Sequence, residues 1–246
     1  MVLPSNASGR DFPENTNSTY RVRLEQTYKF PEREFEVGIS EIHLPSRWKN
    51  ITEGMITIGV NRNGIRSKID GYIRRGCYTD YRQLIAEMER VIRSMSSLQS
   101  VRIAHDDISN QFHISISSEC DMIRFSSDLA TAIGFEGERE YTEKSNKSSL
   151  APDIDQGLTS VYVYLDIVEP WDVGDTRAPL LRIAKMNPPS ADSKGSHIEF
   201  KNIQYVPVRG FNRDVIEVNI RRDDGSIVPF EGGKVSLTLH IRPIKR

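Results

Sequence analysis

Two runs near the C-terminal end of the sequence alternate strictly between apolar and polar residues, and this alternation constrains the fold more than any other feature. In the first run, Ile216, Val218 and Ile220 alternate with Glu217, Asn219 and Arg221. In the second run, Val235, Leu237, Leu239 and Ile241 alternate with Ser236, Thr238 and His240. A period of two places each apolar set on one face of a half-buried β-strand. We therefore expect the segment 234–242 to lie inside a sheet, with its apolar face toward the core.

Other segments predict strands as well, and two of them carry more specific information. Segment 19–30 alternates in the same way, with Tyr20, Val22 and Leu24 on its apolar face. In segment 35–44 the apolar positions change phase, which predicts a β-bulge near Ser40–Glu41. Segment 160–168 is largely apolar on both faces, so it should lie centrally in a sheet.

Helical periodicity is clear in two segments only. In 79–95 one face carries the apolar residues Tyr81, Leu84, Ile85, Met88, Val91 and Ile92. Thr79 is the expected N-cap of this helix, and the apolar face should pack across a sheet. A second, short helix should begin at Ser126 or Ser127 and end at Gly134. Many short strands with two short helices predict an all-β fold, a β-sandwich or a jelly roll, and not a doubly wound α/β sheet.

The polar composition of two segments suggests a domain organisation. Residues 1–18 are rich in Ser, Asn and Pro, and we expect them to form a flexible N-terminal arm that orders against a neighbour. Residues 19–246 should form the jelly-roll domain. Segment 136–157 has few apolar side chains, which predicts a surface loop or a hinge between two parts of that domain.

Charge and hydropathy exclude several classes of partner. The 33 basic and 34 acidic residues give a formal net charge of −1, so no global field favours nucleic acid or anionic lipid. No segment reaches the roughly 18 apolar residues that span a bilayer, and the N-terminal residues lack the pattern of a secretory signal. We expect a protein made in the cytoplasm, in which Cys77 and Cys120 are reduced thiols.

No constellation of residues predicts catalysis, a cofactor or a metal. The histidines are scattered singly along the sequence, without metal-ligand spacing: His43, His105, His113, His197 and His240. The "HDD" at 105–107 suggests turn polarity more than metal binding. The pairs Asp153/Asp155 and Asp223/Asp224 lie in expected turns and are weak calcium candidates. Arg74 and Arg75 could lower the pKa of Cys77, although no local motif supports a nucleophile there.

The sequence resembles the minor capsid, or penton, proteins of Polinton (Maverick) elements and their adintovirus relatives. The most specific blocks are "VYLDIVEP", "PLLRI", "YVPV", "IEVNIRRDDG" and "VPFEGGKVSLTLHIR" in the second half. The first half contributes "FPENTNSTYRVRLEQTYKF", "FEVGISEIHLPSRW", "GYIRRGCYTDYRQLIAEME" and "LATAIGF". The ordered set of blocks covers the chain from about Phe12 to Pro243.

This resemblance implies a jelly-roll penton, five copies of which form a ring at each vertex of an icosahedral particle. It implies a major capsid partner with a double jelly roll, a location in the virion, and no catalytic residues. A host receptor is a further partner to consider. The main alternative is a jelly-roll attachment module that binds carbohydrate or a receptor. A cysteine-dependent enzyme built around Cys77 is a third, weaker alternative.

Overall fold

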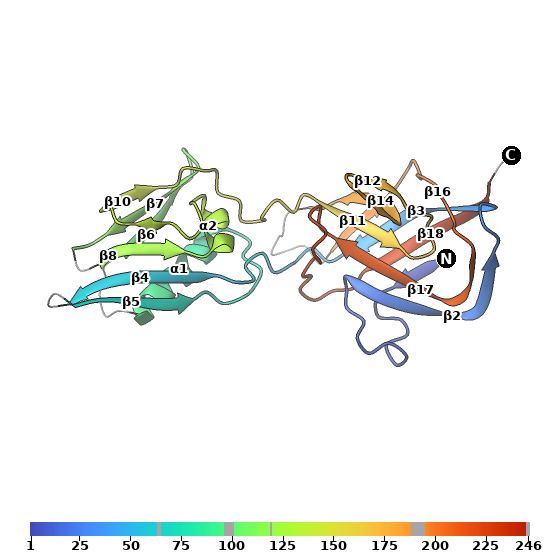
Figure 1. The fold of residues 1–246 in the computed structure, drawn as a ribbon, viewed down its shortest axis with the longest axis horizontal. Helices are drawn as coiled ribbons and strands as arrows, with labels where there is room; N and C mark the ends of the chain where they lie inside the picture. Colours follow the sequence, from blue (N-terminus) through green and yellow to red (C-terminus); the bar gives the residue numbers. More distant parts are fainter. Residues whose placement is uncertain (63–64, 96–100, 119, 188–194, 245–246) are drawn as a thin grey trace. The chain divides into compact units, whose positions relative to one another are not determined.

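A computed structural model describes the chain except for residues 63–64, 96–100, 119, 188–194 and 245–246 (Figure 1). The chain divides into two compact units. The first, here called the jelly-roll unit, comprises Met1–Trp48 and Leu158–Arg246, and the second, here called the inserted unit, comprises Lys49–Gly157. None of the helices among the described residues is both long and apolar enough to cross a membrane.

Two antiparallel sheets form the jelly-roll unit. The first sheet has the order β1-β18-β3-β15, and β16 also pairs with β3. Its strands are β1 (Val2–Pro4), β3 (Phe35–Leu44), β15 (Ser196–Glu199), β16 (Val206–Pro207) and β18 (Ser236–Pro243). The second sheet, β14-β11-β17-β2, comprises β2 (Thr19–Phe30), β11 (Ser160–Leu165), β14 (Leu180–Lys185) and β17 (Phe211–Arg221). A small hairpin of β12 (Trp171–Val173) and β13 (Thr176–Ala178) accompanies them. One apolar core joins the inner faces of both sheets, so the predicted jelly-roll sandwich is confirmed for this unit.

The alternation seen in the sequence matches the burial of these strands. β18 lies between β1 and β3, as predicted, and its residues Leu237 and Leu239 are at most 3% exposed. Val235, which precedes β18, is fully buried, whereas Ile241 is only partly buried. β11 lies between β14 and β17, which confirms its predicted central position. The period-two pattern therefore identified the core face correctly.

The predicted bulge in β3 falls at Ser40. Ile39 pairs with Leu239 and Glu41 pairs with Thr238, so Ser40 is the one extra residue on β3. Its hydroxyl donates to the carbonyl oxygen of Thr238 at 3.1 Å. The extra residue shifts the in–out alternation of the strand by one position. All four apolar residues therefore reach the core: Val37, Ile39, Ile42 and Leu44.

The N-terminal residues do not form the loose arm that the sequence suggested. β1 is an edge strand paired with β18, and Leu3 within it is fully buried. The Tyr20 hydroxyl donates to the Leu3 carbonyl oxygen at 3.0 Å. The Asn15 side chain accepts a hydrogen bond from the Arg21 N–H at 2.9 Å and donates to the Arg21 carbonyl oxygen at 2.8 Å. The prediction was wrong because one apolar anchor and a few amide side chains suffice to fix a polar segment onto a sheet that already exists.

The inserted unit has its own core, built from two sheets and both helices. One sheet is β5-β4-β8-β9, and the other is β10-β7-β6. Their strands are β4 (Met55–Arg62), β5 (Ile65–Tyr72), β6 (Val101–Asp106), β7 (Gln111–Ile116), β8 (Cys120–Phe125), β9 (Glu140–Tyr141) and β10 (Ser145–Lys147). Segment 136–157, expected as a loop or hinge, contributes β9 and β10 to these sheets. The chain divides at 48/49 and 157/158. The jelly-roll domain expected over 19–246, with a two-part organisation about 136–157 as an option, is a jelly roll with an insertion that ends where that segment ends.

The helices lie where the sequence predicts them, with one change in capping. α1 (Tyr81–Met95) buries Leu84, Met88, Val91 and Ile92 against the sheets, while Tyr81 and Ile85 are partly buried. Its N-cap is Asp80 instead of Thr79, because Asp80 Oδ1 accepts the Gln83 N–H at 2.9 Å. α2 (Ser127–Ile133) ends at Gly134, whose φ of 73° is the left-handed conformation expected of a glycine C-cap.

Leu239→Ala tests the core of the jelly-roll unit. Leu239 is 3% exposed, so the variant should lower the free energy of unfolding by on the order of 2–5 kcal/mol. Both tryptophans, Trp48 and Trp171, belong to this unit, so tryptophan fluorescence during urea unfolding reports on it selectively. Thr238→Ala on the opposite face is the control and should cost no more than about 1 kcal/mol. Equal losses in the two variants would contradict the assigned faces.

The fragment 49–157 should fold when it is expressed alone. It contains a complete core, and its two ends are held together, since Gln156 Nε2 donates to the Asn50 carbonyl oxygen at 2.5 Å. Asn50 in turn exchanges two hydrogen bonds with the Tyr78 backbone, at 2.8 and 2.9 Å. We expect a single cooperative thermal transition in the helical circular dichroism signal. A fragment without such a transition would show that the unit depends on the surrounding chain.

Candidate functional site

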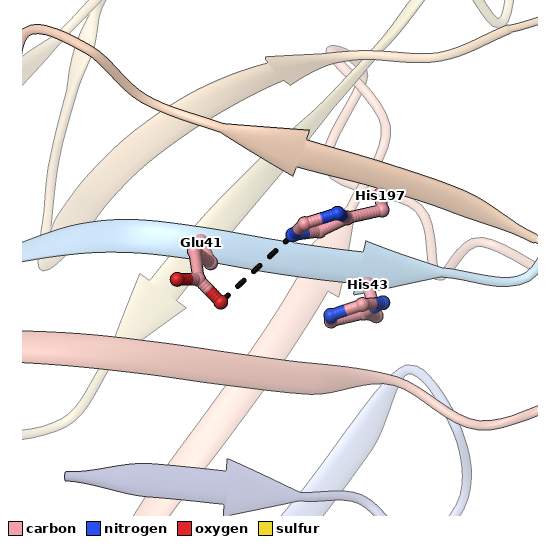
Figure 2. A group of neighbouring side chains, drawn as sticks. All are labelled: Glu41, His43 and His197. Atoms are coloured by element: carbon pink, nitrogen blue, oxygen red, sulfur yellow. Dashed lines mark ion pairs between the residues drawn. The ribbon is translucent and has the colours of Figure 1, made fainter.

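Glu41, His43 and His197 meet on the outer face of the first sheet of the jelly-roll unit (Figure 2). His43 on β3 and His197 on β15 are direct partners across the strand pair. Their rings stack in parallel, with centroids 4.2 Å apart and 4° between the planes. His197 Nε2 lies 3.8 Å from Glu41 Oε2, and the His197 and Glu41 side chains are 52% and 43% exposed. This is a cluster of three solvent-accessible groups that can each donate an electron pair.

Spacing in the sequence could not identify this cluster, because the two histidines come from strands that are far apart along the chain. His43 alternates with the core residues Ile42 and Leu44, so its position on the outer face follows from local periodicity. Which strand would pair with β3 at that position is a long-range property, and no local pattern records it. The expectation of no metal site, which rested on linear spacing, therefore did not consider this pair.

A second polar group lies farther along the same sheet face. His240 Nδ1 and the Tyr205 hydroxyl are 2.8 Å apart. The Arg242 guanidinium lies over the Tyr205 ring, 3.5 Å from its centroid, and its Nε donates to Glu36 Oε1 at 2.6 Å. These contacts pair an aromatic ring, a cation and a carboxylate with one another, so the groups of this surface network are one another's partners.

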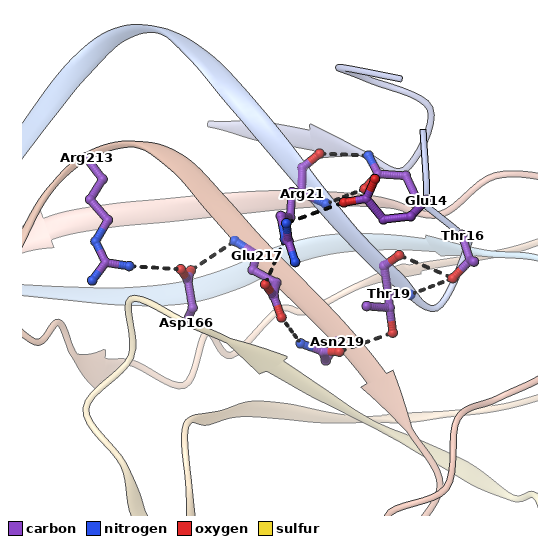
Figure 3. Close-up of polar contacts among 9 residues, drawn as sticks. Glu14, Thr16, Thr19, Arg21, Asp166, Arg213, Glu217 and Asn219 are labelled. Atoms are coloured by element: carbon purple, nitrogen blue, oxygen red, sulfur yellow. Dashed lines mark hydrogen bonds and ion pairs between the residues drawn. The ribbon is translucent and has the colours of Figure 1, made fainter. Parts of the chain in front are cut away.

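The outer face of the second sheet carries a similar network of paired charges (Figure 3). Arg21 Nε donates to Glu217 Oε2 at 3.1 Å, and Asn219 Nδ2 donates to Glu217 Oε1 at 2.9 Å. Asp166 accepts the Glu217 backbone N–H at 3.0 Å and lies 4.0 Å from Arg213. Burial raises the pKa of Asp166, and the neighbouring residues have smaller effects on the same pKa. Partly exposed pairs of this kind add little stability, and their main effect is to cover the strands with mixed charge.

The "HDD" segment comprises the last two residues of β6 and the first residue of the turn that joins β6 to β7. His105 packs against the Tyr81 ring at 4.5 Å and the Phe112 ring at 5.0 Å. Its ring nitrogens lie 2.9 Å from Asp107 Oδ1 and 3.1 Å from Asn110 Oδ1. Asp106, at the end of β6, accepts hydrogen bonds from the hairpin loop. The interpretation of this segment as turn polarity is therefore confirmed.

The two acidic pairs also serve turns. Asp153 accepts the Asp155 N–H at 3.1 Å and the Gly157 N–H at 2.6 Å. Asp224 accepts the Ser226 N–H at 2.8 Å, and its hydrogen bonds with Ser226 lower the pKa of that carboxyl. Backbone donors thus occupy both carboxylate oxygens of Asp153 and one of Asp224, whereas Asp155 Oδ1 is buried without a hydrogen-bond partner among the described residues.

Neither cysteine forms a disulfide. Cys120 is buried, its thiol donates to the Met122 carbonyl oxygen at 3.2 Å, and burial raises its pKa. A raised pKa makes a thiol a poorer nucleophile at neutral pH. Arg74, which the sequence places near Cys77, directs its guanidinium to Glu87 instead. The nucleophile hypothesis for Cys77 therefore loses one of the two arginines on which it depended.

Glu87 is the carboxylate most strongly perturbed by its surroundings. It is 4% exposed on α1, and Arg90 donates to it at 2.8 and 2.7 Å. Arg74 adds side-chain hydrogen bonds, the shortest 2.7 Å, and a backbone N–H at 3.0 Å. The hydrogen bonds from Arg90, opposed by burial and reinforced by Arg74, lower the pKa of Glu87 to about 2. A perturbed carboxylate can mark an active site, but here the Arg74 bonds tie α1 to the segment after β5 and the Arg90 bonds lie within α1, which indicates a structural role.

This ion triad predicts a specific loss of stability in acid. The pKa of Glu87 is lower in the folded protein than its ordinary 4.5, so its contribution is full above about pH 4.5 and is lost as the pH falls toward about 2. This lowering of the Glu87 pKa corresponds to a contribution of about 3 kcal/mol to the free energy of unfolding. Both helices of the described chain lie in the inserted unit, so the helical circular dichroism signal during urea unfolding at several pH values measures it.

Glu87→Gln should remove this part of the pH dependence, while Glu89→Gln, on a more exposed pair with Arg93, should retain it. If Glu87→Gln and the unaltered protein lose stability in parallel between pH 4.5 and 2, the triad does not carry the effect.

Comparisons with known proteins show the fold but assign no family. No protein-family model matches the sequence, and no curated protein is significantly similar to it. Among solved structures, the chain is similar to the crystal structure of the mavirus penton protein, with 12% identity and a TM-score of 0.50. The similarity covers 99% of this chain and 99% of that one, so it includes both the jelly-roll unit and the inserted unit. The chain therefore has the fold of the mavirus penton protein, in agreement with the resemblance to penton proteins seen in its sequence.

Proposed function

We propose that this protein is a penton protein, a structural component of the vertices of an icosahedral virus-like particle. The observation that carries the proposal is the end-to-end structural similarity to the mavirus penton protein, over 99% of both chains. A jelly roll alone would be weak support, because this architecture serves many functions. Here the similarity extends to the inserted unit as well, and the sequence resemblance points to the same class of protein.

The proposed assembly is a homopentamer. A five-fold ring is built from head-to-tail contacts, so each subunit must present two different surfaces that complement each other. Large apolar side chains that are exposed on the jelly-roll unit are candidates for these surfaces: Val2, Trp171, Ile183 and Ile227. Ile183 lies on the edge strand β14 and Val2 on the edge strand β1, so the two belong to different sheets.

The proposed surroundings follow from this role. The pentamer would contact a major capsid protein with a double jelly roll, and the protein would reside at the capsid vertex after synthesis in the host cytoplasm. No catalytic step is required for such a role, so the absence of enzymatic activity remains a prediction. The proposal likewise requires no specific contact with nucleic acid, and a host receptor is a further partner at an exposed vertex.

Size-exclusion chromatography with light scattering tests the assembly. We expect a species of five times the 28.0 kDa chain mass, and a five-fold ring in negative-stain images. Ile183→Asp should shift the protein toward monomer without changing its thermal transition, whereas Ile108→Asp, at a 98% exposed position in the inserted unit, should leave the pentamer intact.

Co-expression with the major capsid protein gives the second readout. The protein should appear in purified particles, at the vertices. A protein that stays monomeric at high concentration and is absent from such particles would overturn the proposal. A stable monomer or trimer that binds glycans would instead support the attachment module.

A further inference from the structure

We propose that Glu41, His43 and His197 bind one divalent transition-metal ion of the zinc type on the outer face of the first sheet. The site would link β15, an edge strand, to β3. This inference is independent of the proposed function, since a capsid vertex needs no metal.

The sheet geometry brings the two imidazoles close together. The Phe200 N–H donates to the Ser40 carbonyl oxygen at 2.8 Å, which marks a hydrogen-bonded position of the β3–β15 ladder. Hydrogen-bonded and non-hydrogen-bonded pairs alternate in an antiparallel ladder, so His43 and His197, three positions farther along, form a non-hydrogen-bonded pair. Side chains approach most closely at such pairs, consistent with the ring distance of 4.2 Å.

Glu41 joins the histidines because of the bulge at Ser40. Before the bulge, Val37 and Ile39 face the core, and a regular strand would place Glu41 and His43 on that same face. The extra residue reverses the phase, so Ile42 turns inward and the two polar side chains turn outward. The same irregularity that completes the core therefore assembles the candidate ligands on the surface (Figure 2).

The distances permit coordination with side-chain movement alone. One ligand atom from each residue lies within 4.8 Å of the other two. Zinc–nitrogen bonds of about 2.0–2.1 Å at a tetrahedral angle separate two ligand atoms by roughly 3.3 Å. The required approach is small, and the exposed side chains of His197 and Glu41 have room to rotate.

The donor set favours zinc or a similar ion over calcium or magnesium. Two imidazole nitrogens suit zinc, copper and nickel, whereas calcium and magnesium prefer oxygen ligands. One carboxylate and water would complete the coordination of zinc. Glu199 lies directly opposite Glu41 on β15 and adds a second carboxylate to the neighbourhood, which further favours a cation.

Calorimetric titration of the untagged, full-length protein with zinc chloride tests the site. We expect one zinc ion per chain, with affinity at least 10-fold lower in His197→Ala and in His43→Gln. His113→Ala, on β7 of the inserted unit, is the matched control and should bind as the unaltered protein does. Zinc should also raise the thermal transition of the jelly-roll unit, followed by tryptophan fluorescence, because an ion that binds only the folded state stabilises it. This increase should be absent in His197→Ala.

A spectroscopic readout makes the assignment independent of stability. Imidazole nitrogen resonances of His43 and His197 should shift together on addition of zinc, while those of His113 should stay in place. The proposal is overturned if the protein takes up no zinc at millimolar concentration. It is also overturned if the double variant His43→Gln/His197→Ala, with an unchanged circular dichroism spectrum, binds zinc as tightly as the unaltered protein.

Discussion

The antiparallel pairing of β18 with β3 is the interaction on which the jelly-roll unit depends. β18 also pairs with β1, and the Leu239 N–H donates to the Met1 carbonyl oxygen at 2.7 Å, so the pairing of the first residues with the sheet requires β18. β3 in turn pairs with β15 and β16. The register of this one pair sets which side chains reach the core, and the bulge at Ser40 is the adjustment that allows it. Core packing, the edge strands and the outward face of β3 all follow from that register.

Features recorded by local periodicity could be predicted from the sequence. The alternation in 234–242 and the apolar faces of 160–168 reported burial directly, since burying one face of a strand requires a period of two. Even the bulge was visible, because the apolar positions Ile39 and Ile42 are out of phase. α1 was equally clear from its helical spacing. The resemblance to penton proteins added the jelly-roll fold, which no local pattern specifies.

Features created by long-range pairing could not be predicted. The boundaries at 48/49 and 157/158 depend on contacts between distant segments, so the insertion appeared in the sequence only as a polar stretch near its end. The N-terminal residues looked disordered because the burial of Leu3 depends on strands that lie far from it in the sequence. The His43–His197 pair was missed for the same reason. The ion pair of Glu87 with Arg74 has no local signal either, because Arg74 precedes the helix and turns back toward it only in the folded chain.

The insertion also imposes an order on folding during synthesis. Neighbouring strands of the inserted unit pair as hairpins, β4 with β5 and β6 with β7, so their loops close quickly. The bond between Ser40 and Thr238, by contrast, spans 198 residues. β18 leaves the ribosome after every strand with which it pairs, and β2 and β3 lack their pairing strands β15, β16 and β17 until after the inserted unit has been made. The nascent chain thus contains a folded inserted unit between the two halves of an incomplete jelly-roll unit. Until the jelly-roll unit is complete, its exposed apolar strands can aggregate, and chaperones are most useful at this stage.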